Sequence, residues 1–123
     1  MTDSPEYKAL LAALVLRLTR KGFLVTHVDG AVGYPQPEEY SLGDTSARPD
    51  VVAAGRNEHP RHVIGIAETA ETWNSLRTQR RLSIYLTNAD KVYVMVPDSV
   101  FEQAQRDGFG ARSTKISYLS PST

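Results

Sequence analysis

Apolar residues near the N-terminus recur every three or four positions, which is the spacing of one stripe along a helix. The stripe consists of Tyr7, Leu10, Leu11, Leu14, Val15 and Leu18. Ser4, Pro5 and Glu6 come first and supply a capping hydroxyl, a ring preset for the first turn and an anion near the positive helix end. Gly22 has the backbone freedom that a helix C-terminus prefers. The pattern predicts a helix from Pro5 to Lys21.

The rest of the chain alternates between runs typical of strands and a helical period. Aromatic and β-branched residues predict strands at Phe23–Asp29, Pro49–Ala54, His62–Glu68, Lys91–Val96 and Lys115–Leu119. Turn residues between the second and third strands indicate an antiparallel hairpin. A helical period predicts a helix from Glu71 to about Thr87, and Asp98 is expected to cap a short helix that runs through Arg106 and ends at Gly108.

The segment from Gly30 to Ala47 has no steady period, so we expect a long irregular loop of a kind that is usually functional or mobile. The order of elements is then helix, three strands, helix, strand, helix, strand. It predicts an α/β fold in which helices pack on a mixed sheet. A chain of 123 residues, 41% of them hydrophobic, can bury one core, so we expect a single domain over residues 1–123.

Charge and composition limit the possible functions. The chain has 14 basic and 14 acidic residues, so affinity for nucleic acid would need a local basic patch. Cysteine is absent, which excludes disulfides, zinc–thiolate sites and thiol nucleophiles. We assign no role to the scattered His27, His59 and His62, and no nucleotide-binding or serine-hydrolase motif is present. Neither a membrane span nor a signal peptide is evident, so we expect a cytoplasmic protein without a membrane partner.

Two short motifs fall at the predicted hairpin. Arg48-Pro49-Asp50-Val51-Val52 opens its first strand, and the run Ile64-Gly65-Ile66-Ala67-Glu68-Thr69-Ala70 ends its second. In order of elements and in these motifs the chain resembles the PD-(D/E)XK, or restriction-endonuclease-like, nucleases, in which one strand begins with Pro-Asp and the next carries Glu-x-Lys. The resemblance spans roughly Tyr7 to Pro97. It implies a restriction-endonuclease-like αβββαβ core with helices flanking a mixed central sheet.

The resemblance also implies a chemistry. In the family, two carboxylates from adjacent strands hold a cation such as Mg²⁺, which polarises the phosphate and activates water, while the lysine orients and stabilises the attacking species. Asp50 and Glu68 are thereby implied as catalytic and metal-binding residues, with Mg²⁺ as the cofactor if the site is active. An active protein would be a metal-dependent endodeoxyribonuclease.

Two registers of the Glu-x-Lys motif are open, because side chains two apart on a strand share a face. In the first, Glu68 is the glutamate and Ala70 stands where the lysine belongs. In the second, which we favour, Ile66 replaces the glutamate and Glu68 replaces the lysine. Neither register supplies a lysine near the strand end. Alternatively, Glu68 caps the helix that starts near Glu71.

The following helix carries the nearest cations. Arg77, Arg80 and Arg81, with Gln79, are candidates for contact with nucleic-acid phosphates. The region of Gln79 and Tyr85 resembles a Gln-Leu and Tyr pattern in related nucleases. Such an arginine run is more often a solvated face, and Trp73 is expected to be a core residue.

Three functions remain open. The leading hypothesis is a degenerate nuclease-fold protein with impaired catalysis that acts in nucleic-acid binding, with DNA as a partner, or in protein assembly. The rival is a divergent Mg²⁺-dependent endonuclease with Asp50 and Glu68 at its centre. The third is an unrelated α/β interaction module, which a structure with those two carboxylates on opposite faces would support. A homodimer through an apolar face of the sheet or of the last helix is also possible.

Overall fold

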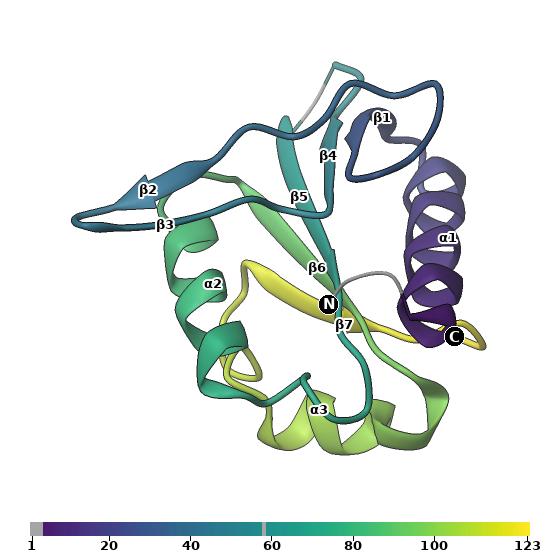
Figure 1. Cartoon of the computed structure of the whole chain (residues 1–123), viewed down its shortest axis with the longest axis vertical. Coiled ribbons are helices and arrows are strands. Elements are labelled where there is room, and N and C mark those ends of the chain that lie inside the picture. The colour runs from purple at the N-terminus through teal and green to yellow at the C-terminus, as the bar shows by residue number, and fades with distance from the viewer. Residues whose placement is uncertain (1–3, 58) are drawn as a thin grey trace.

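The computed structural model describes residues 4–57 and 59–123. Within these residues the fold is α/β, with a five-stranded mixed sheet and three α-helices (Figure 1). The helices are α1 (Pro5–Arg20), α2 (Leu76–Leu86) and α3 (Phe101–Asp107), and a single 3₁₀ turn spans Asp98–Val100. The strands are β1 (Leu24–Val28), β2 (Tyr40–Leu42), β3 (Thr45–Ala47), β4 (Val51–Ala54), β5 (His62–Ala67), β6 (Lys91–Met95) and β7 (Ile116–Leu119).

The main sheet has the order β1-β4-β5-β6-β7. The pairs β1–β4 and β4–β5 are antiparallel, which confirms the predicted hairpin, and β5–β6 and β6–β7 are parallel. Parallel neighbours need a crossover connection, and α2 provides it between β5 and β6. The start of β4 and the end of β5 therefore lie side by side.

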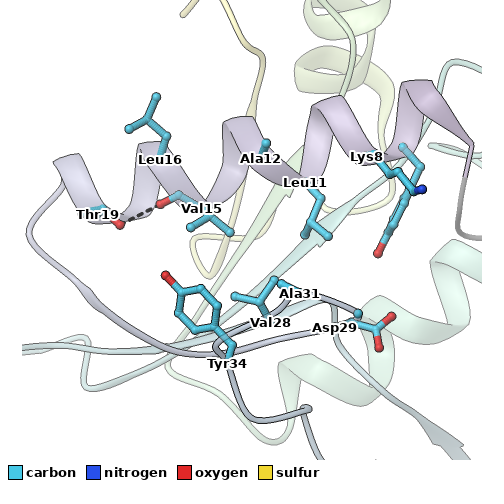
Figure 2. A pocket seen from close by; sticks show the side chains of 12 residues that line it. Lys8, Leu11, Ala12, Val15, Leu16, Thr19, Val28, Asp29, Ala31 and Tyr34 are labelled. Carbon is cyan, nitrogen blue, oxygen red and sulfur yellow. Dashed lines mark hydrogen bonds between the residues drawn. The ribbon is translucent and has the colours of Figure 1, made fainter.

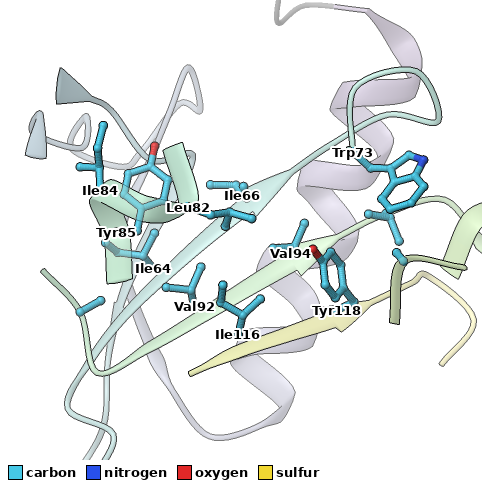
Figure 3. Packing of buried hydrophobic residues seen from close by; sticks show 13 residues of the cluster. Ile64, Ile66, Trp73, Leu82, Ile84, Tyr85, Val92, Val94, Ile116 and Tyr118 are labelled. Atoms are coloured by element: carbon cyan, nitrogen blue, oxygen red, sulfur yellow. The ribbon is translucent and has the colours of Figure 1, made fainter. Parts of the chain in front are cut away.

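Helices cover both faces of the sheet, with α1 on one side and α2 and α3 on the other (Figure 1). The two faces bury separate apolar clusters. One cluster places Leu14 and Leu18 of α1 against Val51 and Val63. The other packs Leu82 and Tyr85 of α2 against Ile64, Ile66 and the middle of β6 (Figure 3). Because each strand of the centre is buried on both faces, its sequence is almost continuously apolar.

Two predicted helix starts were wrong. The helix expected from Glu71 begins at Leu76, because the Ser75 hydroxyl accepts a hydrogen bond from the Thr78 N–H and so caps α2 there. The preceding residues form turns that still bury Trp73, as expected of a core residue. Asp98 does not cap α3, because its carboxylate accepts hydrogen bonds from the backbone N–H and hydroxyl of Ser122.

The loop expected from Gly30 to Ala47 is only partly irregular. Its second half forms the two-stranded hairpin of β2 and β3, in which Gly43 has a φ of 61° at the turn. This hairpin contacts α2 and extends away from the main sheet (Figure 1). No helix in the described part of the chain is long and apolar enough to cross a membrane.

Candidate functional site

The two candidate carboxylates meet at one end of the sheet. Asp50 lies just before β4 and Glu68 just after β5, and each residue is only 3% exposed. In the antiparallel ladder Val51 pairs with Gly65, so Asp50 comes opposite Ile66 and diagonal to Glu68. The two carboxylates do not point to opposite faces, because both contact the same side chain of α2.

That side chain is Arg81. Its Nη1 donates a hydrogen bond to Oε2 of Glu68 at 3.0 Å, and its Nη2 lies 3.6 Å from Oδ1 of Asp50. Nη2 also donates to the carbonyl oxygen of Arg48, and Nε donates to the Tyr85 hydroxyl, each at 3.1 Å. Asp50, Glu68 and Arg81 are referred to below as the buried triad. The guanidinium fork thus bridges two strands to one helix.

Further donors complete the hydrogen bonding of both carboxylates. Asp50 accepts from the Tyr7 hydroxyl and from the Ala67 N–H, both at 2.8 Å. Glu68 accepts from the Thr72 hydroxyl at 2.8 Å. Among the described residues, no buried side-chain nitrogen or oxygen lacks a hydrogen-bond partner. Every member of the buried triad is therefore held by several partners, as a buried ion pair must be to offset its desolvation.

Burial has the largest effect on the pKa values of the two carboxyl groups. It raises the pKa of the Asp50 carboxyl and of the Glu68 carboxyl, while the charge of Arg81 acts in the opposite direction. Burial disfavours the charge on Arg81, but Asp50, Tyr85 and Glu68 outweigh it and the pKa of Arg81 stays above its usual value. Burial and the neighbouring Asp50 also raise the pKa of Tyr7, so its hydroxyl remains a donor.

The residues present fit a divalent cation poorly. Two carboxylates are suitable ligands for Mg²⁺, but the Arg81 guanidinium already lies between them and contacts both. A cation there would have to displace that guanidinium and would meet its positive charge. Within the described residues, no group of three or more His, Asp or Glu side chains is placed to hold a metal ion. The geometry matches an internal ion pair better than a metal centre.

The other residues of α2 that were predicted to contact phosphates do not join Arg81 in the buried triad. Arg77 and Arg80 are exposed and line a groove of about 460 Å³ between β3 and α2, together with Arg48. Neither helix arginine forms an ion pair with a described residue. Gln79 does not line this groove, and its amide bonds the carbonyl oxygen of Asn74. The lining is completed by Thr45, Ser46, Ala47, Leu76, Arg81 and Ile84. We call it the arginine groove.

Sequence reasoning predicts that Asp50 and Glu68 lie together but does not give three other residues their roles at the site. The Pro-Asp motif assigns nothing to Arg48, although its side chain lines the arginine groove and its carbonyl oxygen accepts a hydrogen bond from Arg81. The helix stripe predicts only a core role for Tyr7. Arg81 was grouped with the exposed arginines, although it shares the i, i+3, i+4, i+7 spacing of the core residues Thr78, Leu82 and Tyr85.

Comparison with known proteins adds no family. No protein-family model, no curated protein and no solved structure matches this chain.

Proposed function

We propose that this chain is a degenerate nuclease-fold protein that does not hydrolyse phosphodiester bonds and that binds nucleic-acid phosphates in the arginine groove. The observation that carries the proposal is the contact of Arg81 with both Asp50 and Glu68. In either register of the motif an endonuclease would need Asp50 free to hold its metal ion, and in the first register it would need Glu68 as well. In this chain the permanently charged guanidinium of Arg81 contacts these carboxylates in place of a metal ion.

The arrangement of elements supports the restriction-endonuclease-like part of the proposal. Leaving aside the β2–β3 hairpin, the chain runs α1, β1, β4, β5, α2, β6, which is the αβββαβ order of that core. The Pro-Asp dipeptide immediately precedes β4 and Glu68 immediately follows β5, so the motif residues flank adjacent antiparallel strands at one end of the sheet.

The strand pairing supports the second register of the motif. Extended by one residue, the β4–β5 register brings Ile66 opposite Asp50, and cross-strand neighbours have Cβ atoms about 4.5–5.5 Å apart, close enough to share an ion. In this register Ile66 replaces the second ligand and is fully buried in the α2-side core. Glu68 then replaces the lysine, and Arg81 supplies the positive charge from α2 instead.

The arginine groove supports phosphate binding. Arg48, Arg77 and Arg80 are exposed around a single groove, whereas the chain as a whole is formally neutral. Arginine binds phosphate through a planar pair of N–H groups, and contacts of this kind fix a nucleic-acid backbone without reading its sequence. The local cluster is thus the basic patch that a neutral protein needs for nucleic-acid affinity.

The test compares two double variants that remove the same charge. Arg77→Ala/Arg80→Ala removes two of the three exposed arginines of the arginine groove, and Arg106→Ala/Arg112→Ala removes two exposed arginines outside it. Binding to labelled single- and double-stranded DNA is measured by fluorescence anisotropy over a range of salt concentrations. The groove variant should weaken binding and lower the slope of log affinity against log salt by about 1.8 on double-stranded DNA and about 1.4 on single-stranded DNA, since each phosphate contact contributes about 0.9 and about 0.7, respectively. The control should change neither.

Equal losses in both double variants would mean that the groove is not the binding surface. A cleavage assay with Mg²⁺ and Mn²⁺ runs beside it on the same DNAs. Cutting by the wild type that disappears in Asp50→Asn would favour the divergent endonuclease instead. No cutting together with groove-dependent binding is the result that the proposal requires.

A further inference from the structure

Helix α1 is more apolar than its contact with the sheet requires. Its sequence is apolar without interruption from Ala9 to Leu16. A helix that is apolar on all sides is normally buried on all sides. Here Leu10 and Leu14 are buried against the sheet, but Ala12 is exposed and Leu16 is 50% exposed. The outer face of α1 therefore lacks the cover that its composition predicts.

An apolar groove of about 720 Å³ continues this surface beside the helix. Leu11 and Val15 point from α1 toward Val28, Ala31 and Tyr34 on the facing segment, whereas Leu16 points away from it (Figure 2). The facing segment also carries an exposed apolar side chain, since Val32 next to Ala31 is fully exposed. Contiguous exposed apolar surface of this kind typically marks an interaction site.

The size pattern on α1 is self-complementary in an antiparallel pair. If two copies of α1 cross between Ala12 and Ala13, Leu16 of one copy comes opposite the small Ala9 of the other. Ala12 then comes opposite alanines, so the two backbones can approach closely. A twofold axis through that point repeats each contact, as an isologous interface requires. It also places both apolar grooves on the same side of the pair, where they can close on one another.

The charges select this antiparallel orientation. The C-terminal end of α1 carries Arg20 and Lys21, whereas Glu6 and Asp29 lie near its N-terminal end with Lys8 as the opposing cation. Antiparallel packing brings each basic end onto the more acidic end of the other copy, and the helix dipoles also oppose one another. On a helical wheel Arg20 and Glu6 fall on the same flank, about four turns apart. Parallel packing would bring the two basic ends together.

We propose that the outer face of α1 and the adjoining apolar groove form the interface of a twofold homodimer with antiparallel α1 helices. The partner is a second copy of this chain. The interface lies on the α1 side of the sheet, away from the arginine groove, which lies between α2 and β3 on the other side. The proposal is independent of nucleic-acid binding and replaces the sheet face or last helix as the expected dimer contact.

Sedimentation equilibrium over a wide range of protein concentration tests the interface. Wild-type protein should show a monomer–dimer equilibrium. Leu16→Glu should raise the dissociation constant of the dimer about tenfold or more, because a charge replaces a central apolar contact. The matched control is Leu76→Glu, which places the same change on α2 at a residue 60% exposed. It should leave the dimer unchanged. Both positions are on the helix surface, and circular dichroism checks that each variant is folded.

A charge swap tests the orientation. Arg20→Glu should weaken the dimer, and Glu6→Arg combined with Arg20→Glu should restore it, since Glu6 and Arg20 of opposite copies face one another in the antiparallel pair. Failure of the double variant to restore association would overturn the antiparallel arrangement. A wild-type protein that stays monomeric at every concentration would overturn the interface. The interface would also be overturned if native mass spectrometry showed a wild-type monomer with a bound apolar small molecule, and if Leu16→Glu no longer carried that molecule.

Discussion

Replacing Arg81 with methionine leaves two carboxylates buried without their cation. The side chain loses its hydrogen bonds to Glu68, Tyr85 and the Arg48 carbonyl and its ion pair with Asp50. Breaking a buried ion pair by removing one partner costs about 3–5 kcal/mol. Because a small domain is stabilised by roughly 5–15 kcal/mol in total, Arg81→Met should lose a large share of its stability at neutral pH.

The loss should depend on pH with a definite sign. Burial already raises the pKa values of Asp50 and Glu68, and removal of Arg81 deletes the charge that opposes this rise. An acid whose pKa is higher in the folded state binds its proton more tightly when folded. Its contribution to stability is full below the unfolded pKa, near 4, and is lost as the pH rises through the folded pKa. Arg81→Met should therefore regain stability as the pH falls from neutral toward 5.

Urea unfolding at several pH values measures both effects. Each carboxyl that is protonated only in the folded state changes the free energy of unfolding by about 1.4 kcal/mol per pH unit. The matched control, Arg80→Met, changes an exposed arginine of the same helix and should cost less than about 0.5 kcal/mol. A loss below about 1 kcal/mol in Arg81→Met, or a loss of equal size at pH 5 and pH 7.5, would refute the structural role of the buried triad.

Three further variants test the supports of the site and the fold, each by the free energy of unfolding in urea. Tyr7→Phe removes a 2.8 Å hydrogen bond to Asp50 and should cost about 1.5–3 kcal/mol, the range for bonds to charged groups; no change would mean that water replaces the hydroxyl. Ser75→Ala removes the α2 cap and should cost about 1 kcal/mol, whereas a neutral effect would place the helix start elsewhere. Gly108→Ala would place a Cβ atom 2.6 Å from the backbone carbonyl oxygen of Ala104 and against the Tyr118 hydroxyl, so it should cost about 1–3 kcal/mol, and a stabilised variant would contradict the packing there.

The order of the main elements followed from the sequence because their apolar periods are regular. The hairpin of β4 and β5 was predicted from two short apolar runs separated by turn residues, and it carries both candidate carboxylates. The β2–β3 hairpin was missed because its strands have three residues each, too few to establish an alternation. The start of α2 was placed too early because Trp73 fits a helical period while it packs from a turn.

The partners of the site were less accessible to sequence reasoning. The contact between Tyr7 and Asp50 joins residues 43 positions apart, and no local pattern encodes such a pair. Arg81 could have been separated from Arg77 and Arg80, because its spacing to Thr78 and Tyr85, three and four residues away, places it on the buried side of α2. A charged residue on a core-facing helix position implies a buried partner, and Asp50 and Glu68 were the available carboxylates.

The most direct test of the central claim is calorimetric titration of Mg²⁺ and of Mn²⁺ into the folded wild-type protein and into Asp50→Asn. If Arg81 holds Asp50 and Glu68 in an internal ion pair, neither metal should show binding that depends on Asp50. Stoichiometric binding in the wild type that disappears in Asp50→Asn would contradict the account, because it would show that the carboxylates release Arg81 to hold a metal ion.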